Sequence, residues 1–423
     1  MTTRRCQSNE STVFADQHVT AMRPAPIQIY LDSSDFSTLS DPAKRSPDIV
    51  AVESKLLSWQ EAGRIEIRFS YAHVIEAAPV EQKDLSFARR RLAYIKSLCG
   101  LRCLACPITI IEEEVRRVCT GVVRDVPGGL YRSNGDWIPE FGDDTFDFPS
   151  PEKMVRDEIA ANNLGRAERR KLDRTYFHTA GGLKPKALES LRRSTPVALA
   201  QAVDRYPLTE HALRELGRYL MGSDNRETAL RGLKESFFDL ETYAQWYEKH
   251  WDKTTPTSSW LREAGADLSS SLSAATESFH ELFAKSVALG HETKFVDELR
   301  RDTFQGLLRS MPIGMIRRLA ATLQLENCPD ELPFPWKSMP SLQTAATIAA
   351  HVGRRTAMLP GPSRVARPSD FGDILHTLNL PFVDVFRADG FIASAIFDAK
   401  LPLDTVVVGK FRDLATVIER RLG

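Results

Sequence analysis

The feature that most constrains the fold of this chain is an alternation of strand and helix patterns at both of its ends. Near the N-terminus, β-branched and aromatic runs at 27–31 and 64–70 are typical of buried strands. Each run is followed by a segment with apolar residues at helical spacing, at 48–62 and at 84–99. Strands that alternate with helices form parallel sheets, so this part of the chain is predicted to be α/β.

The same alternation returns near the C-terminus, after a Gly-Pro break. A helix pattern at 369–378 precedes strand patterns at 382–386 and 405–408, and a last helix pattern at 411–422 follows them. Because strand patterns are nearly absent between the two ends, we interpret the ends as two parts of one domain.

The predicted domain consists of residues 26–125 and 346–423, interrupted by an all-helical insertion at 126–345. A polar, irregular segment at 1–25 is expected to be a flexible lead-in. The insertion begins with a Gly-, Asp- and Pro-rich stretch and continues with helical periodicity. A long insertion is tolerated because the entropic cost of closing a loop grows slowly with its length.

Charge and composition limit the classes of partner and compartment. Lys plus Arg and Asp plus Glu both number 56, so a nucleic-acid partner would have to bind a local basic surface. No apolar run reaches the roughly 18 residues of a membrane helix, and the N-terminus lacks the apolar core of a secretory signal. Six cysteines without an export signal indicate reduced thiols. We therefore expect a cytoplasmic protein with no membrane partner.

Four acidic residues lie near the ends of the predicted α/β elements. Asp32 ends the first strand, Asp389 follows the strand at 382–386, Glu76 follows the second strand, and Asp373 lies in a helix. The carboxyl ends of parallel strands meet at one edge of a sheet, so these carboxylates are expected in one pocket. To share hard divalent cations such as Mg²⁺ or Mn²⁺, their oxygens must lie within about 5–6 Å of a common point.

Each of these acids also has a structural interpretation. An Asp at a strand end, such as Asp32, is often the cap of the next helix, and Glu76 is compatible with a solvated helix face. Asp384 is an alternative to Asp389 within the same run, although strand alternation points it elsewhere. Asp370 fits the N-cap of the helix that carries Asp373.

Four motifs, in their order along the chain, resemble the acidic motifs of the PIN-domain family. They are Ile-Tyr-Leu-Asp-Ser-Ser-Asp-Phe-Ser at 29–37, Phe-Ser-Tyr-Ala-His-Val-Ile-Glu-Ala at 69–77, Asp-Ile-Leu-His at 373–376 and Val-Asp-Val-Phe-Arg-Ala-Asp-Gly-Phe at 383–391. The resemblance covers about 26–125 and 362–423. It departs from the family where Ala388-Asp389 replaces a hydroxyl-containing turn, and in the length of the insertion. It implies a metal-binding set of Asp32, Glu76, Asp373 and Asp389, with Ser33 at the hydroxyl position.

The resemblance implies a PIN-like parallel sheet flanked by helices and a metal-dependent nuclease. Bound Mg²⁺ or Mn²⁺ would activate water to hydrolyse phosphodiester bonds, with RNA the favoured substrate. Ser33, Asp370 and His376 are expected to support the four acids. The alternative is a catalytically inactive PIN-like scaffold whose helical insertion binds a protein partner.

Two basic runs are candidate contacts for nucleic acid. Arg89, Arg90 and Arg91 follow the segment that carries Glu76, so they are predicted to bind the nucleic acid. The run from Arg166 to Arg174 is interpreted as a solvated helix face.

A cysteine cluster gives a third, weaker hypothesis. Cys99, Cys103 and Cys106 have the spacing that holds an iron–sulfur cluster in radical enzymes, and Cys119 adds a possible fourth thiolate. The motif follows a helix rather than the first strand of a barrel, so we interpret these residues as packing cysteines.

Overall fold

The structure is a computed structural model that describes most of the chain. It covers residues 25–79, 81–139, 149–162, 164–180, 182–250, 292–328, 338–358 and 367–423. Between 270 and 290 it covers 270, 274, 277, 278, 281, 282 and 284–290. The expected flexible lead-in at 1–25 lies outside the described residues, apart from Ala25.

The core of the molecule is a four-stranded parallel sheet in the order β2-β1-β5-β6. Its strands are β1 (Ile27–Tyr30), β2 (Ile65–Arg68), β5 (Val385–Arg387) and β6 (Val406–Val408). Strand β1 pairs directly with β5, with Ile29 opposite Val385 and Tyr30 opposite Phe386. The prediction that both ends of the chain share one sheet is therefore confirmed, and no strand among the described residues of the insertion runs between them.

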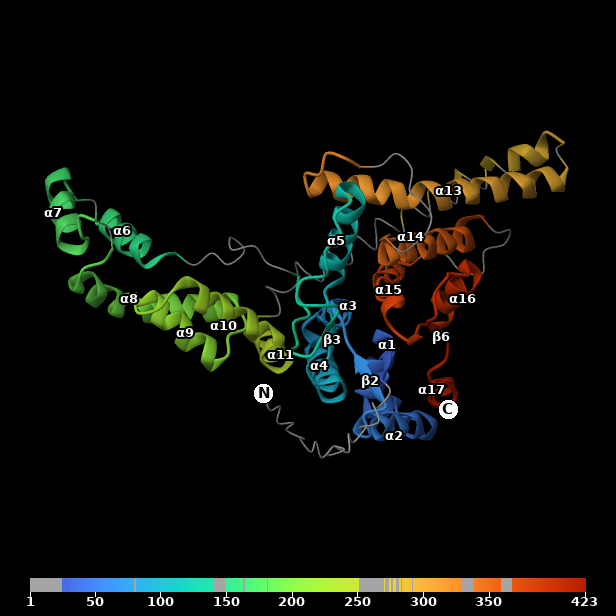
Figure 1. Cartoon of the computed structure of the whole chain (residues 1–423), viewed down its shortest axis with the longest axis horizontal. Coiled ribbons are helices and arrows are strands. Elements are labelled where there is room, and N and C mark those ends of the chain that lie inside the picture. Colours follow the sequence, from blue (N-terminus) through green and yellow to red (C-terminus); the bar gives the residue numbers. More distant parts are fainter. Residues whose placement is uncertain are drawn as a thin grey trace, which may run out of the picture.

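Helices cover both faces of this sheet, as expected for parallel strands (Figure 1). Ile29 and Leu31 pack on one side with α2 (Pro47–Glu61), α4 (Leu85–Cys99) and α17 (Leu414–Leu422). Tyr30 and Phe386 pack on the other side with α14 (Pro340–Gly353) and α16 (Gly390–Ala399). Successive strand residues point to opposite faces, which explains why β1 is apolar at consecutive positions.

Shorter helices start or end at the carboxyl edge of the sheet. They are α1 (Ser33–Leu39), α3 (Tyr71–Glu76) and α15 (Ser369–Thr377). The strand predicted at 382–386 begins later, because Leu380–Phe382 forms a 3₁₀ turn. Pro381 lies inside that turn, and proline has no N–H to donate to a sheet.

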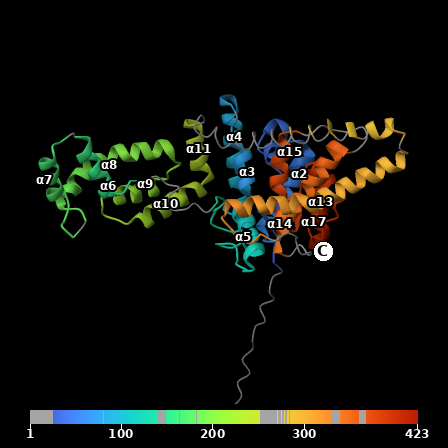
Figure 2. The same ribbon diagram turned by 90° about the horizontal axis from the view of Figure 1, so that it is seen from above.

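The insertion extends from the sheet as a helical arm (Figures 1 and 2). We call helices α6 to α10 the arm; α7 lies at its far end. Their bounds are α6 (Pro151–Ala161), α7 (Arg166–Tyr176), α8 (Pro185–Arg205), α9 (Glu210–Leu220) and α10 (Arg226–Phe238). A separate long helix, α13 (Thr293–Thr322), packs on α14 and on α5 (Pro107–Thr120).

The prediction of an all-helical insertion is wrong at its start. Strand β4 (Tyr131–Arg132) pairs antiparallel with β3 (Cys103–Leu104), which itself lies beside Phe69 at the end of β2. The turn-rich composition of this stretch concealed a two-residue strand, which is too short to show a period.

Parts of the insertion also belong to the core of the sheet domain. Helix α11 (Leu240–Lys249) packs on α4, and its buried Tyr243 and Tyr247 join the core around β1. The boundary predicted at 345 falls inside α14, whose Ile348 and Val352 pack against the sheet. A helical period identifies a helix but not the layer on which it packs.

No helix in the described part of the chain combines the length and the apolar composition that crossing a bilayer requires.

One buried carboxylate attaches α14 to the rest of the domain. Glu114 of α5 accepts hydrogen bonds from the backbone N–H groups of Ser341 and Leu342, at 2.8 and 2.9 Å. These are orphan donors of the first turn of α14. We expect Glu114→Ala to lower the free energy of unfolding by about 1–3 kcal/mol, because two buried donors lose their acceptor.

Chemical denaturation of the variant and the wild type measures this change. The control is Glu113→Ala, which removes only a 4.0 Å ion pair with Arg116 and is expected to change little. Equal stability of the two variants would contradict the proposed role of Glu114.

Candidate active site

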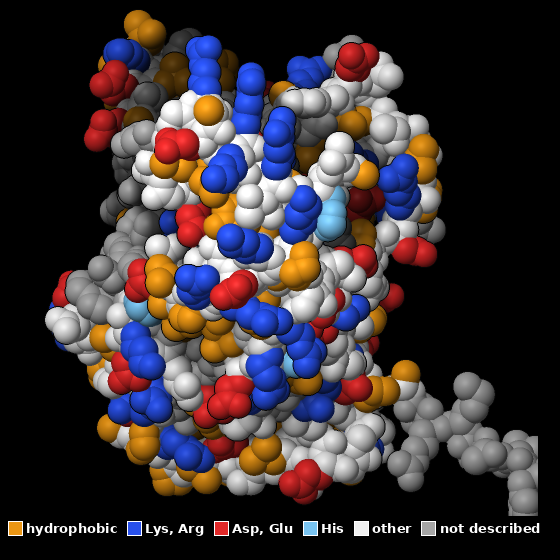
Figure 3. Space-filling model, turned by 90° about the vertical axis from the view of Figure 1, so that its left-hand side faces the viewer, with side chains coloured by type: hydrophobic (Ala, Val, Ile, Leu, Met, Phe, Trp, Pro, Cys, Tyr) orange, Lys and Arg blue, Asp and Glu red, His pale blue; other side chains and the backbone are white. Residues whose placement is uncertain are grey.

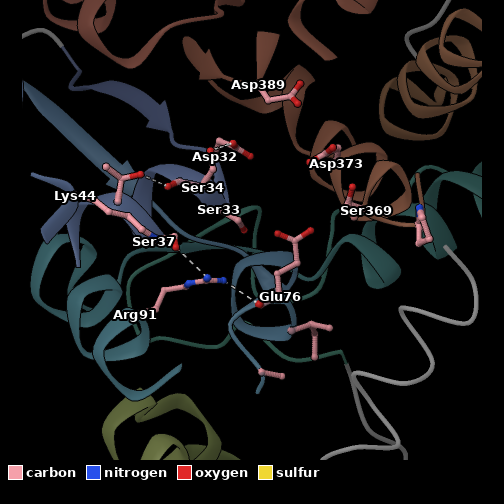
Figure 4. Close-up of a pocket in the computed structure, with 15 residues that line it drawn as sticks. Asp32, Ser33, Ser34, Ser37, Lys44, Glu76, Arg91, Ser369, Asp373 and Asp389 are labelled. Carbon is pink, nitrogen blue, oxygen red and sulfur yellow. Dashed lines mark hydrogen bonds between the residues drawn. The ribbon is translucent and has the colours of Figure 1, made fainter. Parts of the chain in front are cut away.

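A cleft of about 750 Å³ opens at the carboxyl edge of the sheet, and all four predicted acids line it (Figure 4). Asp32 and Asp389 come from loops that follow adjacent strands, β1 and β5. Glu76 is the last residue of α3, and Asp373 lies in α15, which packs on α3. Polar and basic side chains complete the lining: Ser33, Ser34, Ser37, Thr38, Lys44, Arg91 and Ser369.

Asp32 lies above a buried arginine that the sequence pattern did not indicate. The Ser34 hydroxyl donates a hydrogen bond to Asp32, and Arg387 Nη1 lies 3.9 Å from Asp32 Oδ2. Arg387 Nη2 pairs with Asp35 Oδ1 at 2.9 Å. Burial raises the pKa of Asp35 to about 7, although Arg387 opposes this shift. Arg387 thus offsets part of the negative charge beneath the cleft.

Glu76 is held by His376 and Ser33, two of the predicted supporting residues. His376 Nε2 lies 3.1 Å from Glu76 Oε2 and 3.0 Å from Ser33 Oγ. Burial by itself would raise the pKa of Glu76, but His376 lowers it below its usual value. Burial would likewise lower the pKa of His376, but the Glu76 carboxylate raises it overall. The two side chains therefore favour a carboxylate–imidazolium pair.

A buried polar chain continues from His376 away from the cleft. His376 Nδ1 lies 2.6 Å from the Tyr30 hydroxyl, which lies 2.7 Å from Ser70 Oγ. With both ring nitrogens protonated, His376 donates to Tyr30, and Tyr30 can donate to Ser70. This chain fixes the imidazole ring, and hence the position of Glu76. Tyr30 lies in the run 27–31 that was predicted to be a buried strand, and the polar role of its hydroxyl was not predicted.

Asp373 is the acid of the cleft whose negative charge is least offset by neighbouring groups. Among the described residues its carboxylate has no hydrogen-bond partner. Burial, followed by repulsion from Asp32, Asp389 and Glu76, raises its pKa to about 8. The neighbouring Gly372 has no room for a side chain, since a β-carbon there would collide with the Glu76 carboxylate. Glycine at 372 therefore allows α15 to approach Glu76.

Two other acids have structural roles. Asp370 is not the predicted N-cap, because Pro368 occupies that position and Asp370 lies in the first turn of α15. Asp370 is fully buried and accepts a hydrogen bond from Arg367 N at 2.9 Å, which holds the start of α15. It does not line the cleft. Asp384 accepts from Gln28 N at 2.8 Å and pairs with Arg421 at 3.4 Å, near the opposite ends of β1 and β5. Of the two candidates in that run, only Asp389 reaches the cleft.

The three predicted arginines of α4 point in different directions, because neighbouring helix residues are about 100° apart. Arg89 pairs with Glu248 of α11 at 2.8 Å, and Arg90 lies over the Phe87 ring at 4.7 Å. Arg91 alone lines the cleft, where it donates to the Glu76 carbonyl oxygen. Lys44 also reaches the cleft, and no sequence motif marked it.

The acids surround the cleft rather than converging on one point. In the described part of the chain, no group of three or more His, Cys, Asp or Glu side chains is arranged to hold a metal ion. The sequence predicted that the carboxylate oxygens of the four acids lie around a common point, and in this geometry they do not. Glu76 turns toward His376, and Asp389 accepts from Ile392 N at 2.7 Å as the N-cap of α16.

The cysteines lie away from this cleft. Cys99, Cys103 and Cys106 are buried, and burial raises the pKa of Cys103 and Cys106 to about 12. In the described part of the chain, no three of these side chains are arranged to hold a metal ion. Cys119 packs in a different cluster, between α5 and α13.

In comparisons with known proteins, no family model, no curated protein and no solved structure matched this chain. The cleft itself therefore provides the evidence about function.

The raised pKa of Asp373 predicts a pH-dependent cost of folding. The pKa of the Asp373 carboxyl is 3.8 in the unfolded chain and about 8 in the folded protein. Its contribution to the free energy of unfolding is therefore fully present below pH 4 and is lost as the pH rises through 8. We expect Asp373→Asn to melt at a higher temperature than the wild type at pH 8–9, with the difference shrinking toward pH 4. Thermal melts across this range measure it.

The matched control is Asp404→Asn, an exposed acid outside the cleft, which should leave the pH dependence unchanged. A destabilised Asp373→Asn variant at pH 8 would show that the carboxylate is paired.

Proposed function

We propose that this protein is a metal-dependent nuclease with a PIN-like catalytic domain, cleaving phosphodiester bonds of RNA. One observation carries the proposal. Four acids that lie between positions 32 and 389 line a single cleft at the carboxyl edge of a parallel sheet. This edge is where open α/β sheets bind their ligands.

The chemistry of the lining fits a hard divalent cation. Asp32, Glu76, Asp373 and Asp389 offer oxygen donors, the ligands that Mg²⁺ and Mn²⁺ prefer. The uncompensated charge around Asp373 is the feature that a cation would relieve. For these four residues to hold the metal, Glu76 and Asp389 would have to turn from His376 and from the start of α16 into the cleft. A bound metal would lower the pKa of a water and stabilise phosphate charge.

The other residues of the cleft suit a phosphate substrate. Lys44 and Arg91 place cations on its lining, and Arg91 is fixed by hydrogen bonds to Ser37 Oγ and to the Glu76 carbonyl oxygen. A guanidinium held in this way can donate to phosphate oxygens without first ordering its side chain. His376 and Ser33 keep Glu76 in one orientation.

A second candidate function is a catalytically inactive scaffold. It is favoured by the capping roles of the acids, because Asp389 caps α16 and Asp32 occupies the N-cap of α1. The arm also exposes apolar side chains, with Val197 at 63% and Val203 at 41% exposure on α8. A protein partner could cover such residues.

Substitution of the capping acids separates the two functions. Asp32→Asn and Asp389→Asn should each abolish metal-dependent cleavage of RNA. Stability should stay equal or rise, since Asn caps helices as well as Asp and removes one repelling charge. Gel assays of RNA cleavage with and without Mg²⁺ or Mn²⁺, together with thermal melts, measure both effects.

Asp384→Asn is the matched control, because Asp384 lies at the opposite end of β5. It should retain cleavage even if it is less stable. Added Mg²⁺ should raise the melting temperature of the wild type but not of the cleft variants, because a ligand of the folded state stabilises it by mass action. Absence of both cleavage and a metal effect would favour the scaffold.

Arg91 and Arg89 form a second matched pair on one helix. Arg91→Ala should lower kcat by about 10²–10³, the usual effect of losing one donor to transition-state charge. Arg89→Ala should leave kcat unchanged, because Arg89 pairs with Glu248 outside the cleft. Single-turnover cleavage rates measure the difference. Equal cleavage rates for the two variants would show that Arg91 does not contact the phosphate as proposed.

A further inference from the structure

The far end of the arm concentrates positive charge in a chain whose net charge is zero. Residues 164–193, which comprise α7 and the first part of α8, contain nine Lys and Arg against three Asp and Glu. This gives the segment a formal charge of +6, while the whole chain has a charge of 0. We call the exposed basic residues of this segment the basic tip.

The arginines of α7 follow one side of the helix. Arg166, Arg170 and Arg174 are spaced one turn apart and are exposed. Leu172 and Tyr176 point to the other side, where they pack with α6 and α8. The helix is thus attached to the arm by a narrow apolar stripe, and its arginines face solvent over a length of about 12 Å.

Most of this charge is not neutralised by the protein. In the described part of the basic tip, the ion pair found is Arg193 with Glu189, at 3.3 Å. A helix face that is only solvated usually carries charges of both signs in i,i+4 pairs. Figure 3, which views the molecule from the side of the arm, shows Lys and Arg side chains spread over this face.

The composition of the basic tip suits phosphate oxygens. Six of the nine cations of residues 164–193 are arginines, whose planar guanidinium groups bind phosphate in a bidentate manner. A row of such groups along one helix matches a row of phosphates better than a single anion. A nearby arginine, Arg156 of α6, lies over the Phe177 ring at 4.4 Å and extends the basic surface.

We propose that the basic tip binds the sugar–phosphate backbone of RNA at a position remote from the cleft. This inference rests on the proposed function, since it assigns a second contact to the same substrate. The run from Arg166 to Arg174, which the sequence analysis interpreted as a solvated helix face, would then bind RNA phosphates. Backbone contacts of this kind position a nucleic acid without reading its sequence.

The length of the arm determines the minimum length of an RNA that can contact both the basic tip and the cleft. Helix α8 has 21 residues and spans about 30 Å. B-form DNA rises about 3.4 Å per base pair and A-form RNA rises less, so an RNA duplex that reaches from α7 past α8 toward the cleft needs more than about ten base pairs. Shorter RNA can contact only one of the two surfaces.

The test compares two triple variants that lose the same charge. Arg166→Gln, Arg170→Gln and Arg174→Gln together remove the α7 row, and Gln keeps the helix propensity. The control combines Lys294→Gln, Arg309→Gln and Arg318→Gln, three exposed cations of α13. Fluorescence anisotropy measures binding of a 30-base-pair RNA duplex in EDTA, where metal-dependent cleavage cannot occur. A DNA duplex of equal length and anionic phosphatidylserine vesicles are the other probes.

We expect the α7 variant to bind the RNA duplex about tenfold more weakly or worse. The slope of log Kd against log salt should fall by about 3, as for the loss of three phosphate contacts on a duplex. The α13 control should bind as the wild type does. Circular dichroism and thermal melts verify that both variants are folded.

Several outcomes would overturn the proposal. They are no RNA binding by the wild type, equal affinity of the α7 and α13 variants, or an α7-dependent preference for DNA or for the vesicles over RNA. These outcomes are independent of the nuclease proposal. If the wild type does not cleave RNA but its RNA affinity depends on the α7 arginines, the nuclease proposal alone is refuted. If the wild type cleaves RNA and the α7 variant binds RNA with unchanged affinity, the basic-tip proposal alone is refuted.

Discussion

The pairing of β1 with β5 is the interaction on which the rest of the structure depends. Only two residue pairs form it, Ile29 with Val385 and Tyr30 with Phe386, and they join segments that the whole insertion separates. The pairing is reinforced by stacking of Tyr30 on Phe386 and by Asp384, whose side chain and backbone N–H both bond Gln28. Without it, Asp32 and Asp389 would not share an edge.

Closing this long loop costs entropy, which the buried strands and their two covering helix layers must offset. The carboxylates at the edge add a second cost, since acids that share a buried cleft repel each other. The fold reduces this cost unevenly. Arg387 lies beneath Asp32 and Asp35, and His376 pairs with Glu76, but Asp373 keeps a raised pKa. Remaining strain of this kind is expected at functional sites.

The sequence predicted the elements that carry a local pattern. The apolar β1, the helix of Asp373 and the order of the four acids were all visible, because a strand end or a helix period marks each of them. Arg387, Lys44 and the Tyr30 hydroxyl were not visible, since their roles arise from contacts between distant segments. Nor could a period show that α4 would send only Arg91 into the cleft.

The distribution of charge gives the molecule two different ends. A net charge of zero at the level of the chain conceals acids gathered around the cleft and arginines gathered on α7. An acidic cleft repels the phosphates of a polyanion until a cation is bound there, so the cleft alone is a poor first contact. A basic surface on a projecting arm attracts the same polyanion at long range and holds it nearby. In the proposed function, the separation of the two charges along the arm would let the cleft bind a cation and α7 bind the polyanion without neutralising each other.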